Sequence, residues 1–284
     1  MPDFGIMRGF NEKLFGDKLV AGQLPTQLGL IGSSDFGTDP DAQAFFDRVT
    51  TAGGSLSATE KLAVDTLVKQ MKLDGIWTLM KAIYPMVGAS AAACAQNLKS
   101  SSFTGTFTTG FTFASTGVTG NGVSSYMNTN FAPSGNLIVA NNHLSFYSRT
   151  ALSSTFGSEI GLMGYSSTAW MNMRTNNPQT YAFGQDAPAV FATTTGDGFI
   201  LAISRSVTDR RILQDNILNV VDTRNNTGTL STQNIIILAG LPFTNYSSLN
   251  QCAFASIGDG LTNTEASNFY TAVQAFQTTL SRQV

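Results

Sequence analysis

FTGTFTTGFTF, residues 103–113, is the stretch that indicates the fold class of this chain of 284 residues. Its phenylalanines occupy positions 103, 107, 111 and 113, which are all odd. Successive side chains of an extended strand point to opposite faces, so these four rings share one face if the chain is extended. A helix would instead repeat its apolar residues every three or four positions. The stretch therefore predicts β-structure beyond residue 99.

Further strands are expected downstream, at residues 143–149, 198–204 and 234–238, with polar turns between them. Many short strands separated by polar turns are typical of a β-sandwich or jelly roll. Thr262 and Glu265 fit a capping box, which predicts a helix that closes the chain. The apolar stripe of this helix consists of Ala266, Phe269, Tyr270, Val273 and Leu280.

Residues 39–99 have the pattern of a small helical unit. Asp39 offers an N-cap before a proline at the first helical position, and Ser57 with Glu60 fits a second capping box. A third apolar segment, residues 76–83, is assigned to the same helical unit. Such a unit cannot bury its own apolar faces, so it is expected to pack against another part of the structure.

Residues 1–38 contain frequent glycines and scattered apolar side chains. A flexible tail is one interpretation, but solvated tails are poor in phenylalanine and leucine. We therefore expect an extended arm that becomes ordered against a partner. The residues assigned to this docking role are Phe4, Ile6, Phe10, Leu14, Phe15 and Leu19.

Charged residues are scarce and unevenly distributed. They make up 12% of the chain, whereas an average soluble protein has about 25%. All lysines precede residue 100, and most threonines follow it. This shift in composition indicates a change of architecture. The predicted parts are an extended docking arm (1–38), a small helical linker or docking unit (39–99) and a concanavalin-like β-sandwich with a terminal helix (100–284).

Charge and hydropathy exclude two classes of function. A net charge of −2 and a pI near 5.3 provide no electrostatic footprint for nucleic acid. The sequence has no run of 18 or more uncharged apolar residues, so membrane insertion is not expected. The first residues include several charges and no apolar signal-peptide core, so synthesis and folding in a cytoplasm are expected.

The chain has two cysteines, Cys94 and Cys252. Two cysteines cannot form a disulfide framework or a four-ligand zinc site. Two buried free thiols are favoured, and a single bridge between them is the alternative.

Three stretches of the sequence carry a family resemblance. LVKQMKLDGIWTLMKAIYPMVG (67–88), NLIVANNHLSFYSRT (136–150) and FASIGDGLTNTEASNFYTAVQAFQTTL (254–280) resemble segments of tailed-bacteriophage structural proteins. The last stretch is also similar to the end of laminin-G and concanavalin-like domains, where a strand leads through a capped turn into a helix. The resemblance covers roughly residues 39–284, and it is specific at the two ends and weaker in the middle.

The resemblance implies a virion protein with a concanavalin-like jelly roll, such as a head decoration, fibre or tail component. Its partners would be capsid, portal or tail proteins, it would occur in many copies, and its sandwich could contact host glycans. Lectin-type relatives commonly hold calcium through paired Asp and Asn side chains. The predicted sandwich has no compact D-x-[DN] cluster, so calcium is allowed by the resemblance without being indicated by the residues.

A candidate glycan site follows from residue types, because aromatic faces pack on sugar rings while amides and guanidinium groups bond to hydroxyls. The alternative is that Trp170 belongs to the sandwich core. A second candidate is the polar loop 205–211, for which a solvated hairpin turn is the alternative. The residues of the first cluster are Tyr165, Trp170, Asn172, Arg174, Asn176 and Asn177.

A glycoside hydrolase is the alternative function, and we expect no enzyme. Glycosidases need two carboxyl groups flanking the scissile bond, but Glu159 is the single glutamate between residues 100 and 264. The single histidine, His143, opens a predicted strand without an adjacent acid, which favours a structural role. The expected function is therefore display of the sandwich on a particle, with the N-terminal region docked.

Overall fold

The computed structural model describes residues 37–151, 157–162, 172–175, 180–183, 190–193, 196–225, 229–239 and 247–284. Within the chain, Thr38–Val284 form one compact unit. The six apolar residues predicted to dock the arm lie outside the described residues, as do Tyr165, Trp170, Asn176 and Asn177.

Helices gather at the two ends of the described chain, and their first turns follow the capping signals of the sequence. Asp39 accepts a hydrogen bond from the backbone N–H of Asp41 at the start of α1. Ser57 and Thr262 each form a complete capping box, which satisfies backbone N–H groups that the helix itself leaves free. The helices are α1 (Pro40–Thr51), α2 (Ala58–Leu73), the 3-10 helix η2 (Trp77–Leu79), α3 (Ala91–Cys94) and α4 (Asn263–Thr279).

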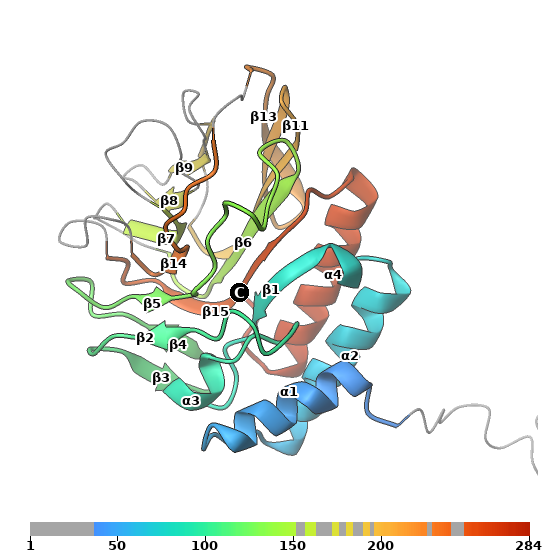
Figure 1. The fold of residues 1–284 in the computed structure, drawn as a ribbon, viewed down its shortest axis with the longest axis vertical. Helices are drawn as coiled ribbons and strands as arrows, with labels where there is room; N and C mark the ends of the chain where they lie inside the picture. The colour runs from blue at the N-terminus through green and yellow to red at the C-terminus, as the bar shows by residue number, and fades with distance from the viewer. Residues whose placement is uncertain are drawn as a thin grey trace, which may run out of the picture. The chain divides into compact units, whose positions relative to one another are not determined.

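The strands form two main sheets and a short hairpin, and the named strands pair antiparallel (Figure 1). Sheet A is β1 (Met80–Tyr84), β3 (Thr112–Ala114), β4 (Gly117–Thr119), β6 (Asn142–Ser148), β11 (Gly198–Ser206), β12 (Asp209–Gln214), β13 (Ile217–Asp222) and β15 (Gln251–Gly258). Sheet B is β2 (Thr106–Phe107), β5 (Met127–Asn128), β7 (Gly157–Gly161), β8 (Asn172–Thr175) and β14 (Ile236–Ile237), and the hairpin is β9 (Thr180–Phe183) with β10 (Val190–Thr193).

Strand β15 lies at the centre of sheet A. One edge of it pairs with β6, and the other edge is shared between β4 and β1. The order of the main path is β13-β12-β11-β6-β15-β4-β3. The three stretches that carry the family resemblance supply β1, β6 and β15, together with α2 and α4, so segments far apart in sequence meet in one part of the fold.

The inner strands β6, β11 and β15 of sheet A are buried on both faces, because their side chains alternate between two cores. On β6, Phe146 belongs to the core between sheets A and B, and its neighbour Tyr147 belongs to the core under the helices. On β11, Ile200 and Leu201 divide in the same way. The structure therefore has three layers, namely helices, sheet A and sheet B, and the sandwich with its closing helix is confirmed.

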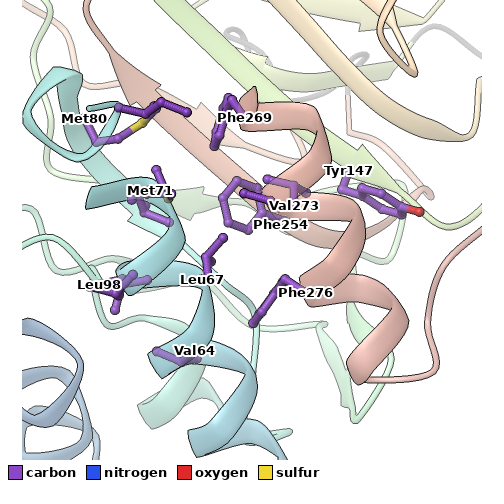
Figure 2. Close-up of a cluster of buried hydrophobic side chains, with 14 of the residues drawn as sticks. Val64, Leu67, Met71, Met80, Leu98, Tyr147, Phe254, Phe269, Val273 and Phe276 are labelled. Carbon is purple, nitrogen blue, oxygen red and sulfur yellow. The ribbon is translucent and has the colours of Figure 1, made fainter. Parts of the chain in front are cut away.

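The core under the helices is rich in aromatic rings. Phe254 of β15 and Phe269 of α4 have ring centroids 6.0 Å apart, and Phe276 lies 6.2 Å from Phe254. Figure 2 shows α2 and α4 side by side over these rings, with Leu67 between the two helices and the sheet. Burial of each such side chain contributes on the order of 2 kcal/mol. The helical unit therefore packs on sheet A, as its apolar faces required.

The prediction that residues 76–83 belong to the helical unit is wrong for most of the segment. Only η2 is helical there, and the following residues form β1, which pairs with β15. The run of apolar residues is short, and both faces of the strand are buried, with Ala82 in one core and Ile83 in the other. A short continuous apolar run does not distinguish a buried strand from a buried helix by its periodicity.

The 103–113 stretch crosses between the sheets, since it holds β2 of sheet B and leads into β3 of sheet A. All four phenylalanines are partly buried against the core between the sheets, but they do not share one extended strand as the odd spacing predicted, because turns interrupt the stretch and β2 and β3 belong to different sheets. Phe107 forms edge contacts with Phe111 and Phe113 at centroid distances of 4.9 and 5.0 Å. These rings close the sandwich at one margin.

Cys94 and Cys252 are both buried and unbridged, which confirms the favoured interpretation. Burial raises the pKa of Cys94 to about 12 and that of Cys252 well above its ordinary value. A thiol is reactive as its thiolate, so these two are inert near neutral pH.

Candidate functional site

A groove of about 610 Å³ opens where the start of α2, the turn after β1 and the end of α4 meet. This hydroxyl groove carries no aromatic side chain among its lining residues, and its character is set by serine and threonine. The lining residues are Ser55, Leu56, Ser57, Thr59, Glu60, Gly88, Ala89, Ser115, Thr279, Leu280 and Ser281.

One wall of the hydroxyl groove is the turn that follows β1. Met86, Gly88 and Ala89 of this turn have positive φ angles of 49°, 80° and 43°. A Cβ at Gly88 would lie 2.5 Å from the Cβ of Ala93, so both the backbone angle and the space require glycine. Non-glycine residues with positive φ cost energy and persist where the surroundings hold them in place.

Two buried or half-buried charges hold this turn. The Glu60 carboxylate accepts a hydrogen bond from the Gly88 N–H at 2.7 Å, and it also accepts the N–H and hydroxyl of Ser57. Arg282 is fully buried and donates to the carbonyl oxygens of Pro85 and Met86. The sequence did not indicate either contact, because Glu60 lies 28 positions from Gly88 and Arg282 lies almost two hundred positions from the turn.

The groove offers neutral hydrogen-bonding groups at a rigid wall. Its hydroxyls can donate or accept, while the Glu60 carboxylate is already engaged by Ser57 and Gly88. Such a lining suits a polar uncharged partner, either a chain segment of another protein or a polyhydroxylated ligand.

The residues predicted for glycan binding are only partly described. Asn172 and Arg174 belong to β8, the edge strand of sheet B within the described residues, with Met173 between them paired to Ile160. Their backbone positions are known, and the other four members of the predicted cluster lie outside the described residues.

His143 is fully buried and acts as a structural residue. Its Nδ1 lies 2.6 Å from the carbonyl oxygen of Asp259, which can only accept, so Nδ1 carries the proton. Nε2 then accepts from the Ser256 hydroxyl at 3.1 Å, and Ser145 donates to Ser256 at 2.6 Å. Burial lowers the pKa of His143 to about 4, so the ring is neutral near pH 7.

Glu159 is also fully buried, on β7. Its carboxylate accepts hydrogen bonds from the Ser248 hydroxyl at 3.0 Å and from the Asn250 amide at 2.8 Å. A general acid or nucleophile has to reach its substrate, and these contacts instead place Glu159 in the interior. A stabilising role of Glu159 follows from its contacts.

The second predicted candidate, loop 205–211, contains the turn between β11 and β12. Val207 at its tip is 42% exposed, which matches the hairpin interpretation. Arg205 and Arg211 at its base, however, turn toward the first residue of α4, Asn263. Sequence spacing could not indicate this contact, since more than fifty positions separate each arginine from Asn263.

Within the described residues, no group of three or more His, Cys, Asp or Glu side chains could hold a metal ion. Among the same residues, no helix has the length and apolar character needed to cross a bilayer.

No protein-family model and no curated protein matches the sequence. Similar solved structures include the binding domain of botulinum neurotoxin serotype D, with 12% identity and a TM-score of 0.49 over 69% of this chain and 52% of that one. Domain 4 of AbnA, an extracellular arabinanase from Geobacillus stearothermophilus solved with arabinotriose, has 11% identity and a TM-score of 0.44 over 67% of this chain and 98% of that one.

A Trypanosoma rangeli sialidase in complex with 2,3-difluorosialic acid has 13% identity and a TM-score of 0.41, over 74% of this chain and 39% of that one. This chain therefore spans about half of the neurotoxin structure and less of the sialidase. Likenesses at these identities concern the fold and assign neither a ligand nor an activity to this chain.

Proposed function

We propose that this chain is a structural component of a tailed-bacteriophage particle that docks through its N-terminal region and displays its β-sandwich. The observation that carries the proposal is the layered asymmetry of residues 38–284. Helices α1, α2 and α4 share a core with one face of sheet A, while sheet B lies on the other side of sheet A (Figure 1). The two sides of this unit therefore differ in structure and in chemistry.

The distribution of charge supports the same orientation. All lysines precede residue 100, so no strand from β2 to β15 carries one. On the helical side, Lys72 forms ion pairs with Asp39 and Asp41 at 2.7 and 2.6 Å. A surface with few charges attracts other macromolecules weakly by electrostatics, which suits an exposed part of a particle.

The assignment to a phage particle rests on the family resemblance. Its three stretches supply neighbouring elements, since β1 and β6 both pair with β15 and α2 packs on α4. A resemblance that gathers at the centre of the fold is better support than three matches scattered over the surface. The role on a phage particle is an inference by analogy, because a fold hosts many functions.

Deletion of residues 1–38 tests the docking half of the proposal. Thr38–Val284 form a compact unit, so the truncated chain is expected to fold, with an unchanged circular dichroism spectrum. It should no longer join particles assembled in its presence. The full chain is the matched control. Normal incorporation of the truncated chain would refute docking through the arm.

We further propose that the displayed sandwich binds host glycans and does not cleave them. The burial of Glu159 and its contacts with Ser248 and Asn250 argue against a catalytic role for this carboxylate. A glycan array probed with the full chain tests binding, and release of reducing sugar from host polysaccharide tests cleavage. Cleavage that disappears in Glu159→Gln would instead favour the hydrolase alternative.

A further inference from the structure

A β-bulge near the end of strand β11 redirects the side chain of Arg205. Ser204 pairs with Arg210 and Ser206 pairs with Asp209, so Arg205 is the extra residue of the hairpin. Bulges redirect a side chain and are frequent next to functional sites. This bulge brings the Arg205 guanidinium to the beginning of α4, where Nε donates to the carbonyl oxygen of Leu261.

A second guanidinium reaches the same point from β12. Arg211 pairs with Ile203, whose side chain lies in the core under the helices, so Arg211 lies on that same face of sheet A. The Asn263 Oδ1 atom accepts hydrogen bonds from Arg205 Nη1 at 2.7 Å and from Arg211 Nη1 at 3.1 Å. One neutral amide oxygen thus bridges two cations.

The two arginines differ in their negative partners. Arg211 forms an ion pair with Asp209, with Nε–Oδ1 and Nη2–Oδ2 distances of 2.7 and 3.1 Å. The hydrogen-bond partners of Arg205 within the described residues are neutral oxygens, and its Nη2 has none there. The Glu265 carboxylate, which is near, is engaged by the Thr262 N–H at 2.7 Å.

Arg205 therefore stays charged without a carboxylate bonded to it. Burial, and next the neighbouring Arg211, lower the pKa of Arg205 from its ordinary value, but a guanidinium remains protonated at physiological pH. The hydrogen bond to the neutral Asn263 amide is already charge-assisted, but an anionic acceptor would add the attraction between opposite charges, and guanidinium groups bind carboxylates and similar oxyanions in matching geometry. An anionic oxygen would fit this position better than the amide oxygen of Asn263 does.

We propose that Arg205 and Arg211 form a binding site for the anionic group of an acidic saccharide, and that the exposed Asn263 side chain occupies the place of that group in the free protein. The ligand would bring a carboxylate or a sulfate to the two Nη1 atoms. This inference rests on the glycan-binding half of the proposed function and names the chemical class of glycan.

The surroundings favour a saccharide over a strongly acidic peptide. Thr208 and Thr264, the exposed neighbours of the site in sequence, carry hydroxyls, and Asn216 donates its amide to Ser267 on the exposed side of α4 at 3.1 Å. With Asp209 engaging Arg211, one guanidinium remains without a negative partner. The site therefore fits a single negative charge on a neutral hydrogen-bonding body.

The test is an NMR titration of the full chain with sodium D-glucuronate, D-glucose 6-sulfate, methyl D-glucoside and inorganic sulfate. At least one of the two acidic sugars should bind. Comparison of glucuronate with glucose 6-sulfate shows whether the site takes a carboxylate or a sulfate. Arg205→Gln and Arg211→Gln should each weaken that binding roughly tenfold or more. Arg224→Gln, which removes an exposed arginine outside the site, should leave it unchanged. Asn263→Ala should strengthen binding, because both guanidinium groups lose their internal acceptor.

Four results would overturn the inference. They are equal binding of methyl D-glucoside and the acidic sugars, inorganic sulfate binding as tightly as the sugars, unchanged affinity in both arginine variants, and no binding at all. Weakened binding in Asn263→Ala would refute the exchange of Asn263 for the ligand. Incorporation of Arg205→Gln into particles should be normal, so a failure of this site and a failure of particle docking are distinguishable.

Discussion

Arg282 donates a hydrogen bond from Nη2 to the carbonyl oxygen of Pro85 at 2.7 Å, although 197 positions separate the two residues. The same guanidinium also donates to Met86, Ala253 and Gln277. It therefore joins the end of the chain to β15 and to the turn that forms one wall of the hydroxyl groove. Burial lowers its pKa to about 10, which leaves it charged near neutral pH.

Arg282→Met should lower the free energy of unfolding by about 3 kcal/mol or more, because several buried carbonyl oxygens lose their donor together. Urea denaturation followed by circular dichroism measures the change. Arg224→Gln is the control, since its side chain is 48% exposed and Asp222 keeps its ion pair with Arg210 in this variant. Equal stability of the two variants would contradict the role given to Arg282.

His143 should make the protein sensitive to acid. Its folded pKa is near 4, below the unfolded value of 6.5, so the unfolded chain binds the proton more readily. The stability from neutral His143 is complete above about pH 6.5, falls as the pH falls toward 4 and is lost below that. The loss amounts to about 3 kcal/mol. Urea denaturation of wild type and His143→Gln between pH 7 and pH 4 measures the free energy of unfolding of each protein. The two plots of this free energy against pH should converge as the pH falls. Parallel plots would contradict the role given to His143.

Gly88→Ala should destabilise more than Gly53→Ala. Both glycines have φ near +80°, so both substitutions carry the cost of a left-handed backbone conformation, about 1–2 kcal/mol. Only at Gly88 would the new Cβ meet other atoms, namely Ala93 Cβ at 2.5 Å and Ser55 O at 2.7 Å. The difference between the melting temperatures of the two variants measures the steric cost at Gly88 apart from the backbone cost. Identical melting temperatures would show that the wall of the groove is not tightly packed.

Thr262→Ala should cost about 1 kcal/mol of stability, because it removes the capping box at the start of α4. Thr264→Ala, two positions further on, is the matched control, since Thr264 is exposed in the first turn. The free energy of unfolding from urea titrations decides between them. Comparable losses in both variants would mean that the cap contributes nothing specific.

Glu159→Leu should destabilise the sandwich by about 2 kcal/mol, because the Ser248 hydroxyl and the Asn250 amide lose a buried acceptor. Glu159→Gln keeps an oxygen and the side-chain volume, so its loss should be smaller. Urea denaturation of the pair measures the difference. Full stability of the leucine variant would show that these contacts are replaced at no cost.

Local signals were sufficient for several elements. The capping residues Ser57 and Thr262 act within three positions of their partners, so the starts of α2 and α4 could be predicted from spacing alone. The phenylalanines in 103–113 do lie against one core, but they reach it from two strands of different sheets, which their odd spacing did not indicate. Periodicity was uninformative for β1, whose residues are buried on both faces and therefore show no alternation.

The candidate sites depended on contacts that local sequence does not encode. Asn263 meets Arg205 through a bulge in β11, and Gly88 meets Glu60 across 28 positions. Each contact requires two elements to pack in one particular way. Residue types and spacing within one segment therefore cannot predict it. The predicted glycan residues were chosen because they were neighbours in sequence, and of these Asn172 and Arg174 lie on the described strand β8.

The sequence by itself determined the class of the fold and the starts of α1, α2 and α4, because propensity, capping and hydrophobic pattern act over a few residues. Tertiary structure decided that the front helices and α4 share one core on sheet A. It also decided where the buried charges Arg282 and Glu159 find their partners. Those positions follow from packing, since a buried charge is stable only where distant segments supply its hydrogen bonds.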